Sequence, residues 1–163
     1  MNVRRIRTAL LLSIFALGIL AAPTTSPAIV GGHDAPNGAY PSNVQISYVN
    51  LGISFECTGT LISPQWILTA GHCGSATGIA GNSPVQWPPQ LIALRVGGDT
   101  RGGGERVTAD RTVGHPSQQL GIRYDIAMIH LAAPSTKAPT KVVGVTEGAS
   151  WVSGTLETIV GWG

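Results

Sequence analysis

Residues suited to acid–base chemistry gather at two points of the sequence. The first is the histidine of Leu68-Thr69-Ala70-Gly71-His72-Cys73, which follows a strand-like run and precedes a cysteine. The second is Asp125, which heads the otherwise mostly apolar run Asp125–Leu131. A histidine that acts as a general base must be held in one rotamer and tautomer, and a carboxylate at the start of a core strand can orient its second ring nitrogen. Their spacing alone is weak evidence for a catalytic pair. Whether the two residues meet depends on the elements that position them.

The remaining histidines have no comparable neighbours. We interpret His33, His115 and His130 as surface or core residues, because most lone histidines have such roles. Nothing in the sequence brings His72, His115 and His130 to the spacing of metal ligands, so no metal site is expected. We expect no cofactor.

The first 28 residues have the pattern of a secretory signal peptide. Arginines precede the apolar run Ala9–Ala22, which as a helix spans about 21 Å of the ~30 Å hydrocarbon core of a membrane. Ser26-Pro27-Ala28 places small residues at the last and third-last positions of a cleavage site. We therefore expect a secreted, extracellular protein whose mature chain begins at Ile29. A short membrane anchor is the alternative, and the general secretory route fits these residues better than a twin-arginine signal.

Export determines how the two cysteines are interpreted. Cys57 and Cys73 are the only cysteines of the chain, and an oxidising compartment favours a disulfide between them. The alternative, a zinc site, needs more ligands at close spacing and is not favoured.

The mature chain consists mainly of short strand-like runs separated by turn residues. Alternating or continuous apolar residues predict six strands, at residues 44–49, 53–62, 66–69, 91–96, 105–113 and 125–131. Residues 74–89 indicate a long surface loop, and 97–104 a glycine-rich hairpin turn that lacks the Lys-Ser/Thr of a phosphate-binding loop. No helix is expected. Six short strands are typical of a small closed antiparallel barrel.

Residues beyond the six strands indicate the start of a further unit. A linker is expected from Pro134, and residues 141–146 and 155–160 are strand-like. We predict a signal peptide at 1–28, a first β-barrel at 29–133, and a linker with a truncated start of a second barrel at 134–163.

Composition excludes several classes of protein. With 43% apolar and only 11% charged residues, the chain is not expected to be disordered. A formal charge of +2 leaves no basic footprint for nucleic acid. After signal cleavage no membrane association is expected, and we expect a monomer.

Four motifs occur in an order that resembles the trypsin/chymotrypsin-like family of serine proteases. Ile29-Val30-Gly31-Gly32 resembles the family's mature N-terminus, and Tyr40-Pro41 follows at the expected place. Residues 68–73 resemble the histidine motif, with Gly71 where alanine is commoner. Asp125-Ile126-Ala127-Met128 resembles the aspartate motif, and Gly161-Trp162-Gly163 the turn that opens the second barrel.

The resemblance implies an all-β fold whose first half is a six-stranded antiparallel barrel. It also implies a secreted endopeptidase that hydrolyses peptide bonds of protein or peptide substrates. His72 would be the general base, Asp125 its orienting partner, and Cys57–Cys73 the bridge beside the histidine.

The family's nucleophilic serine lies in a Gly-Asp-Ser-Gly-Gly motif, and no serine of these 163 residues has that surrounding. The resemblance is therefore to the N-terminal part of the family, without the nucleophile and the residues that set specificity. The alternative is a non-catalytic pseudoprotease or binding module, and a third hypothesis is a product without a stable fold.

Overall fold

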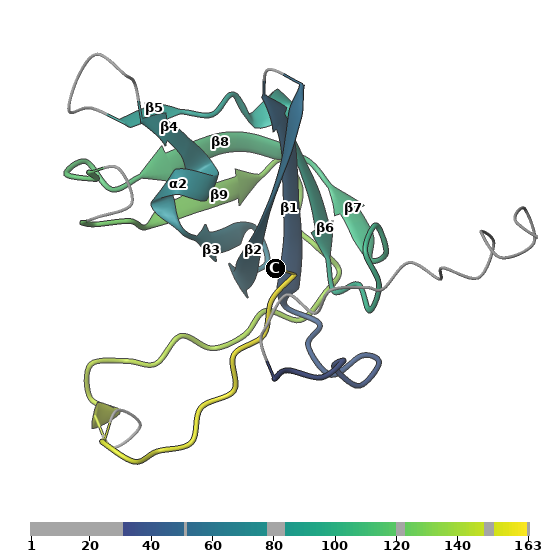
Figure 1. The fold of residues 1–163 in the computed structure, drawn as a ribbon, viewed down its shortest axis with the longest axis vertical. Coiled ribbons are helices and arrows are strands. Elements are labelled where there is room, and N and C mark those ends of the chain that lie inside the picture. Colours follow the sequence, from purple (N-terminus) through teal and green to yellow (C-terminus); the bar gives the residue numbers. More distant parts are fainter. Residues whose placement is uncertain (1–30, 51, 78–83, 120–122, 149–151, 163) are drawn as a thin grey trace, which may run out of the picture.

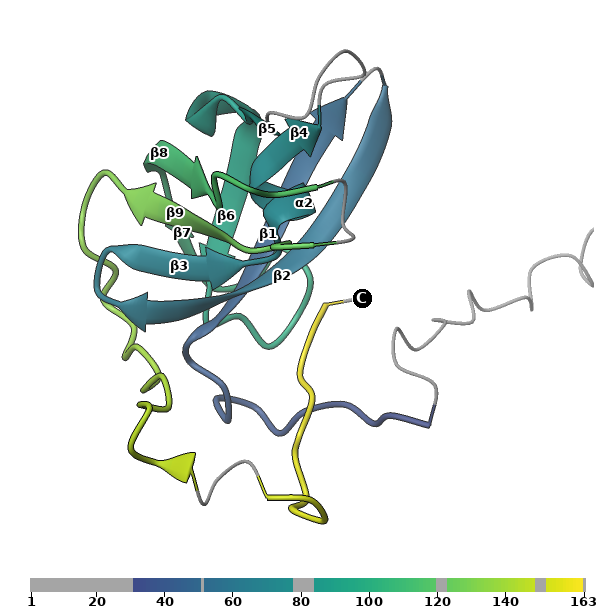
Figure 2. The same ribbon diagram turned by 90° about the vertical axis from the view of Figure 1, so that its left-hand side faces the viewer.

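The computed structural model describes residues 31–50, 52–77, 84–119, 123–148 and 152–162. The predicted signal peptide and Ile29 lie outside this part of the chain. A curled antiparallel sheet of seven strands dominates the fold (Figures 1 and 2). In their order of pairing the strands are β7 (Glu105–Val107), β6 (Ile92–Val96), β1 (Asn43–Asn50), β2 (Ile53–Ser63), β3 (Trp66–Thr69), β9 (Ala127–Leu131) and β8 (Ala109–Gly114).

The two edges of this sheet are joined through the chain itself. β7 pairs with β6 at one edge and β8 pairs with β9 at the other, yet only Thr108 separates β7 from β8. Residues 105–113 therefore form two strand segments instead of the single predicted one, and the register against β9 shifts between Ala109 and Arg111. The predicted antiparallel all-β fold is confirmed.

Alternate residues of β1, β6, β9 and the second half of β2 contribute to a common apolar core, as the two-residue period of a strand requires. In β1 the residues Val44, Ile46 and Tyr48 are buried, and β6 contributes Ile92, Leu94 and Val96. The other buried apolar residues of this core are Cys57, Leu61, Ile67, Cys73, Ile129 and Leu131. Burying each large aliphatic side chain contributes about 1.5–3 kcal/mol, so this core fixes the register of the strands.

The prediction of one long loop at residues 74–89 is wrong. This stretch contains a separate two-stranded sheet, β4 (Ser75–Thr77) with β5 (Pro84–Gln86), and the 3₁₀ turn η1 (Pro89–Leu91) precedes β6. A single helical turn, α2 (Gly71–Gly74), was also not expected. Segments of three or four residues are too short to have an apolar period, so no sequence pattern predicts them. Among the described residues, no helix has the length or apolar content to cross a lipid bilayer.

The strand-like runs at 141–146 and 155–160 are not strands in the structure. A strand requires a neighbour for its backbone groups, and neither run pairs with another described segment. Their apolar side chains are exposed, with Val145, Leu156 and Ile159 at 103%, 99% and 81%. The boundaries of the predicted domains stay a prediction.

The segment that follows β9 is bonded to the barrel at several points. The backbone N–H groups of Ser135 and Thr140 donate to the carbonyls of Pro64 and Leu61. Figures 1 and 2 show the chain then running away from the barrel and returning to it near β2. There the Trp162 N–H donates to the Thr58 hydroxyl over 2.8 Å.

Glu105 attaches the start of this segment to β7. Its carboxylate accepts hydrogen bonds from the hydroxyls of Ser135 and Thr136 and from the Thr136 N–H. Burial opposes ionisation of Glu105, but these bonds and the nearby charge of Lys137 keep its pKa below its usual range.

Candidate active site

The pairing of β3 with β9 brings the two predicted catalytic residues together. In this antiparallel pair Thr69 lies opposite Ala127. His72 follows the end of β3 within the helical turn α2, and Asp125 precedes the start of β9. Because antiparallel strands place the end of one beside the beginning of the other, residues distant in the sequence meet at one edge of the barrel.

Asp125 holds His72 by two atoms at once. Its Oδ2 lies 2.7 Å from the His72 ring nitrogen Nδ1, and its Oδ1 accepts a 2.8 Å hydrogen bond from the His72 backbone N–H. An ionised carboxylate only accepts hydrogen bonds, so Nδ1 carries the proton and Nε2 has a free lone pair. The His72 side chain is 60% exposed and that of Asp125 only 24%. The carboxylate is sheltered while the imidazole remains accessible.

The surroundings of Asp125 favour its ionised form. Burial opposes ionisation, but the hydrogen bonds from the His72 ring and backbone, the histidine's charge and the Gly71 N–H outweigh it. Together they keep the pKa of the Asp125 carboxyl below its usual range. Asp125 is therefore a carboxylate at neutral pH, as the protonation of Nδ1 requires.

A disulfide fixes the helical turn that carries His72. Cys57 in β2 is bonded to Cys73 in α2, with their Cα atoms 6.1 Å apart, so the predicted bridge is confirmed. It restrains the backbone one residue from the histidine. Ligand atoms of Cys57, His72 and Cys73 lie within 4.8 Å of one another. The two sulfurs are bonded to each other, so they are not thiolate ligands for a metal.

Gly71 is explained by its contact with Gln118. A Cβ added at Gly71 would lie 2.5 Å from the Gln118 side chain, which is 1% exposed. The absence of a side chain at this position leaves room for a buried glutamine beside the histidine turn. This accounts for glycine where the resembling motif more often has alanine.

Tyr124 and His115, which sequence reasoning did not assign to the site, support the turn that carries Asp125. Tyr124 has a φ of 53°, a left-handed conformation that is uncommon for a side chain of this size. Its ring stacks on His115 with centroids 4.7 Å apart, and the His115 N–H donates to the Ile126 carbonyl. His115 is thus a support for the turn that carries Asp125. No pattern in the sequence predicts a left-handed tyrosine.

His130 forms a second histidine–aspartate pair on the barrel. Its Nδ1 lies 2.7 Å from Asp110 Oδ1, and its ring packs edge-on against Trp66 with centroids 4.6 Å apart. His130 lies in β9, within the strand predicted at residues 125–131, and forms no hydrogen bond with His72.

Within the part of the chain that the structure describes, no serine is hydrogen-bonded to the pair. Among the described residues, His72 has no hydrogen bond to a hydroxyl group. The geometry brings together an accessible imidazole and a carboxylate that contacts its Nδ1.

The curled antiparallel barrel with a His–Asp pair beside a disulfide has the architecture of a chymotrypsin-type serine protease. Residues 29–163 match the protein-family model described as Trypsin, and the chain belongs to this family.

Elastases and a trypsin are among the proteins to which the chain is similar. The chain is 31% identical over 152 residues to human chymotrypsin-like elastase family member 1, and 30% identical over 151 residues to the Macaca fascicularis protein of the same name. It is 30% identical over 149 residues to trypsin 5G1 of Aedes aegypti. These alignments cover 86%, 86% and 85% of this chain, but 54%, 52% and 49% of the relatives. The chain thus spans about half the length of these relatives.

Proposed function

We propose that this chain acts in a secreted trypsin-like serine endopeptidase, with His72 as general base and Asp125 as its orienting partner. The observation that supports this most directly is the two-atom contact of the Asp125 carboxylate with the His72 ring and backbone. An aspartate that only paired with the ring would leave the imidazole free to swing. One that also bonds the backbone N–H ties the position of the base to the helical turn.

The chemistry follows from the tautomer. With Nδ1 protonated, the Nε2 lone pair of His72 can accept the proton of a serine hydroxyl as that oxygen attacks a peptide carbonyl. The imidazolium that forms is stabilised by the Asp125 carboxylate 2.7 Å away. His72 then returns the proton to the leaving amine, and water hydrolyses the acyl-enzyme by the same transfers.

We infer that the nucleophilic serine and the oxyanion-hole amides come from sequence outside these 163 residues. No serine here stands in a Gly-Asp-Ser-Gly-Gly setting. The substrates would be proteins or peptides, and export through a signal peptide at 1–28 would place the reaction outside the cell.

The coding sequence beyond codon 163 provides the test. If it continues, the extended protein is expected to hydrolyse peptide substrates and to react with a serine-directed fluorophosphonate, whereas the 163-residue chain does neither. An extended protein that is folded but inactive would favour the alternative, a non-catalytic binding module. Stoichiometric labelling of the 163-residue chain would mean that another nucleophile is present.

His130 offers a matched control for His72. Both rings lie 2.7 Å from a carboxylate, but only His72 has the backbone contact and the disulfide beside it. In the extended protein His72→Ala should abolish fluorophosphonate labelling and peptide hydrolysis. His130→Ala should leave both activities unchanged. Equal losses in the two variants would contradict the assignment of the base.

A further inference from the structure

Two arginines stand directly opposite each other on the outer face of the barrel. Arg95 of β6 is in register with Arg106 of β7. Residues opposite each other in an antiparallel pair share a face, and the neighbours of Arg95 in β6, Leu94 and Val96, are buried in the core. Both guanidinium groups therefore project outward. Like charges in this arrangement repel and destabilise the pair of strands unless an anion lies near.

Neither arginine has an ion-pair partner among the described residues. All eight carboxylate residues of the sequence lie among the described residues, and none of them forms an ion pair with either arginine. Six of them are engaged elsewhere: Glu56, Asp99, Glu105, Asp110, Asp125 and Glu147. On the other side of Arg95, Gln45 is also engaged, because its amide oxygen accepts the Gly102 N–H over 2.9 Å.

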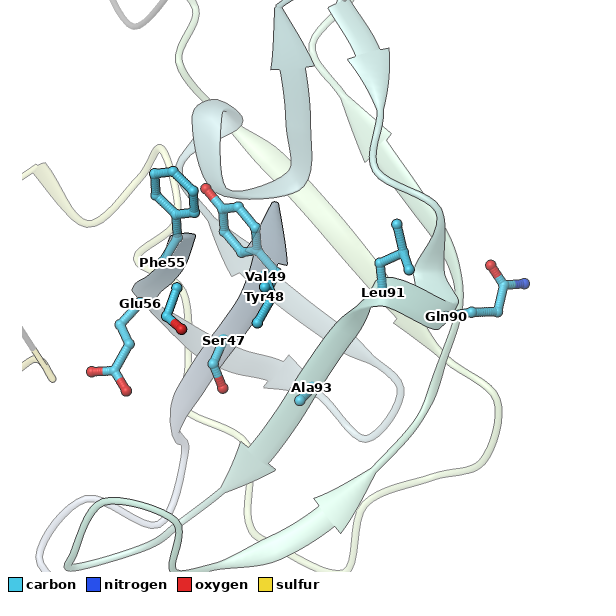
Figure 3. A pocket seen from close by; sticks show the side chains of 9 residues that line it. Ser47, Tyr48, Val49, Phe55, Glu56, Gln90, Leu91 and Ala93 are labelled. Atoms are coloured by element: carbon cyan, nitrogen blue, oxygen red, sulfur yellow. The ribbon is translucent and has the colours of Figure 1, made fainter. Parts of the chain in front are cut away.

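An open hollow of about 430 Å³, shown in Figure 3, is lined by residues of β1, β2, η1 and β6. Ala93 and Ser47, which are paired across β6 and β1, line it one strand period from Arg95 and Gln45. Val49 and Leu91 line it further along and are 62% and 54% exposed. The Glu56 carboxylate also lines the hollow, but it is ion-paired with Arg101. The hollow thus offers apolar surface and one neutralised carboxylate beside the positive charge of Arg95 and Arg106.

We propose that the outer face of β1, β6 and β7 is a docking surface for an acidic polypeptide segment that carries apolar side chains. Arg95 and Arg106 would bind its carboxylates, since guanidinium groups pair with carboxylates in a bidentate fork. The hollow at Val49 and Leu91 would take its apolar side chains. A short extended segment, at about 3.3 Å per residue, reaches both features with a few residues.

The combination of charge and apolar surface favours a polypeptide over a sulfated polysaccharide. A polysaccharide would be bound by charge alone and has no apolar side chains for the hollow. The arginine end of this surface lies away from the candidate active site, because β7 and α2 lie on opposite sides of the barrel in Figure 1. The proposal goes beyond the proposed function and does not depend on catalysis.

The test measures binding of a fluorescein-labelled synthetic peptide of alternating glutamate and leucine to the full chain by fluorescence anisotropy. The variant Arg95→Gln/Arg106→Gln is expected to bind it about tenfold more weakly, which corresponds to about 1.4 kcal/mol. The control Arg123→Gln/Lys141→Gln removes the same charge elsewhere and should bind as the wild type does. The separate substitution Leu91→Ser should weaken binding of this peptide. It should not change binding of a control peptide of alternating glutamate and serine.

Several outcomes would overturn the proposal. Equal weakening in the two charge variants would mean that only net charge matters, and absence of saturable binding to the wild type would leave no docking surface. Loss of heparin binding in the Arg95→Gln/Arg106→Gln variant, with peptide binding unchanged, would assign the surface to a polysaccharide. Folding is checked by the melting temperature, which should not fall in this variant because the substitutions relieve like-charge repulsion.

Discussion

Replacing Asp125 with asparagine tests the candidate site at its most constrained point. The carboxylate accepts hydrogen bonds from both the ring Nδ1 and the backbone N–H of His72. An asparagine has one acceptor and one donor end. If its oxygen keeps the backbone N–H, its amide nitrogen faces Nδ1 and must donate to it. The His72 ring then carries its proton on Nε2 and cannot act as a base at that atom.

The magnitude follows from these contacts. A hydrogen bond to a charged group contributes about 1.5–3 kcal/mol, and asparagine retains neutral bonds in its place, so we expect Asp125→Asn to lower the free energy of unfolding by about 1–2 kcal/mol. For a domain of this size that corresponds to a fall of about 3–6 °C in melting temperature. The same substitution in a chymotrypsin-type protease lowers kcat by about 10⁴, and we expect a similar loss in the extended protein.

The effect on stability should depend on pH with a defined sign. Hydrogen bonding lowers the pKa of Asp125 in the folded chain, so its contribution is present above the pKa of the unfolded state and is lost as pH falls through the folded pKa. The quantity to measure is the difference in melting temperature between wild type and Asp125→Asn. It should narrow below about pH 4.

Nitrogen-detected NMR of the imidazole rings distinguishes the tautomers directly. Wild-type His72 should show a protonated Nδ1 and an unprotonated Nε2 at neutral pH, and Asp125→Asn should show the reverse. His130 serves as an internal reference, because its contact with Asp110 is untouched. If the variant keeps the Nδ1–H tautomer and still loses activity, the reasoning from orientation and tautomer is refuted.

Three other measurements check separate parts of the structure. Replacing Cys57 and Cys73 together by serine should lower the free energy of unfolding by about 3 kcal/mol in a urea titration, and an unchanged midpoint would contradict a structural role for the bridge. Gly59→Ala should cost about 1–3 kcal/mol in the same assay, because its Cβ would lie 2.6 Å from the Ile67 side chain. N-terminal sequencing of secreted protein should begin at Ile29, and a start further upstream would indicate a propeptide.

The barrel could be predicted because its strands bury one face. In β1 the alternation of Val44, Ile46 and Tyr48 with polar residues indicates both the strand and its inward side. The split of residues 105–113 could not be predicted, since it depends on which neighbour each half pairs with. The runs at 141–146 and 155–160 have strand-forming residues but no described partner, and local pattern alone does not make a strand.

The sequence indicates the candidate residues that stand in motifs, but not the residues that support them through contacts in the folded chain. His72 and Asp125 stand in recognisable motifs, and the structure places them in contact. The left-handed Tyr124 and its stacking on His115 depend on contacts that form only after the chain has folded. Contacts of this kind leave no recognisable composition or periodicity in the sequence.

Distance alone does not define the candidate base, because the barrel has two histidine–aspartate pairs with the same 2.7 Å separation. His130 lies within β9 and packs against Trp66, with a side chain only 21% exposed, whereas its partner Asp110 is 49% exposed. At the first pair this order is reversed: the carboxylate is sheltered and the His72 ring is open to solvent. A base must reach a substrate while the charge that orients it is shielded from water, which strengthens their interaction. Exposure of the ring and shelter of the carboxylate, together with the backbone contact, distinguish the candidate His72–Asp125 pair from the His130–Asp110 pair.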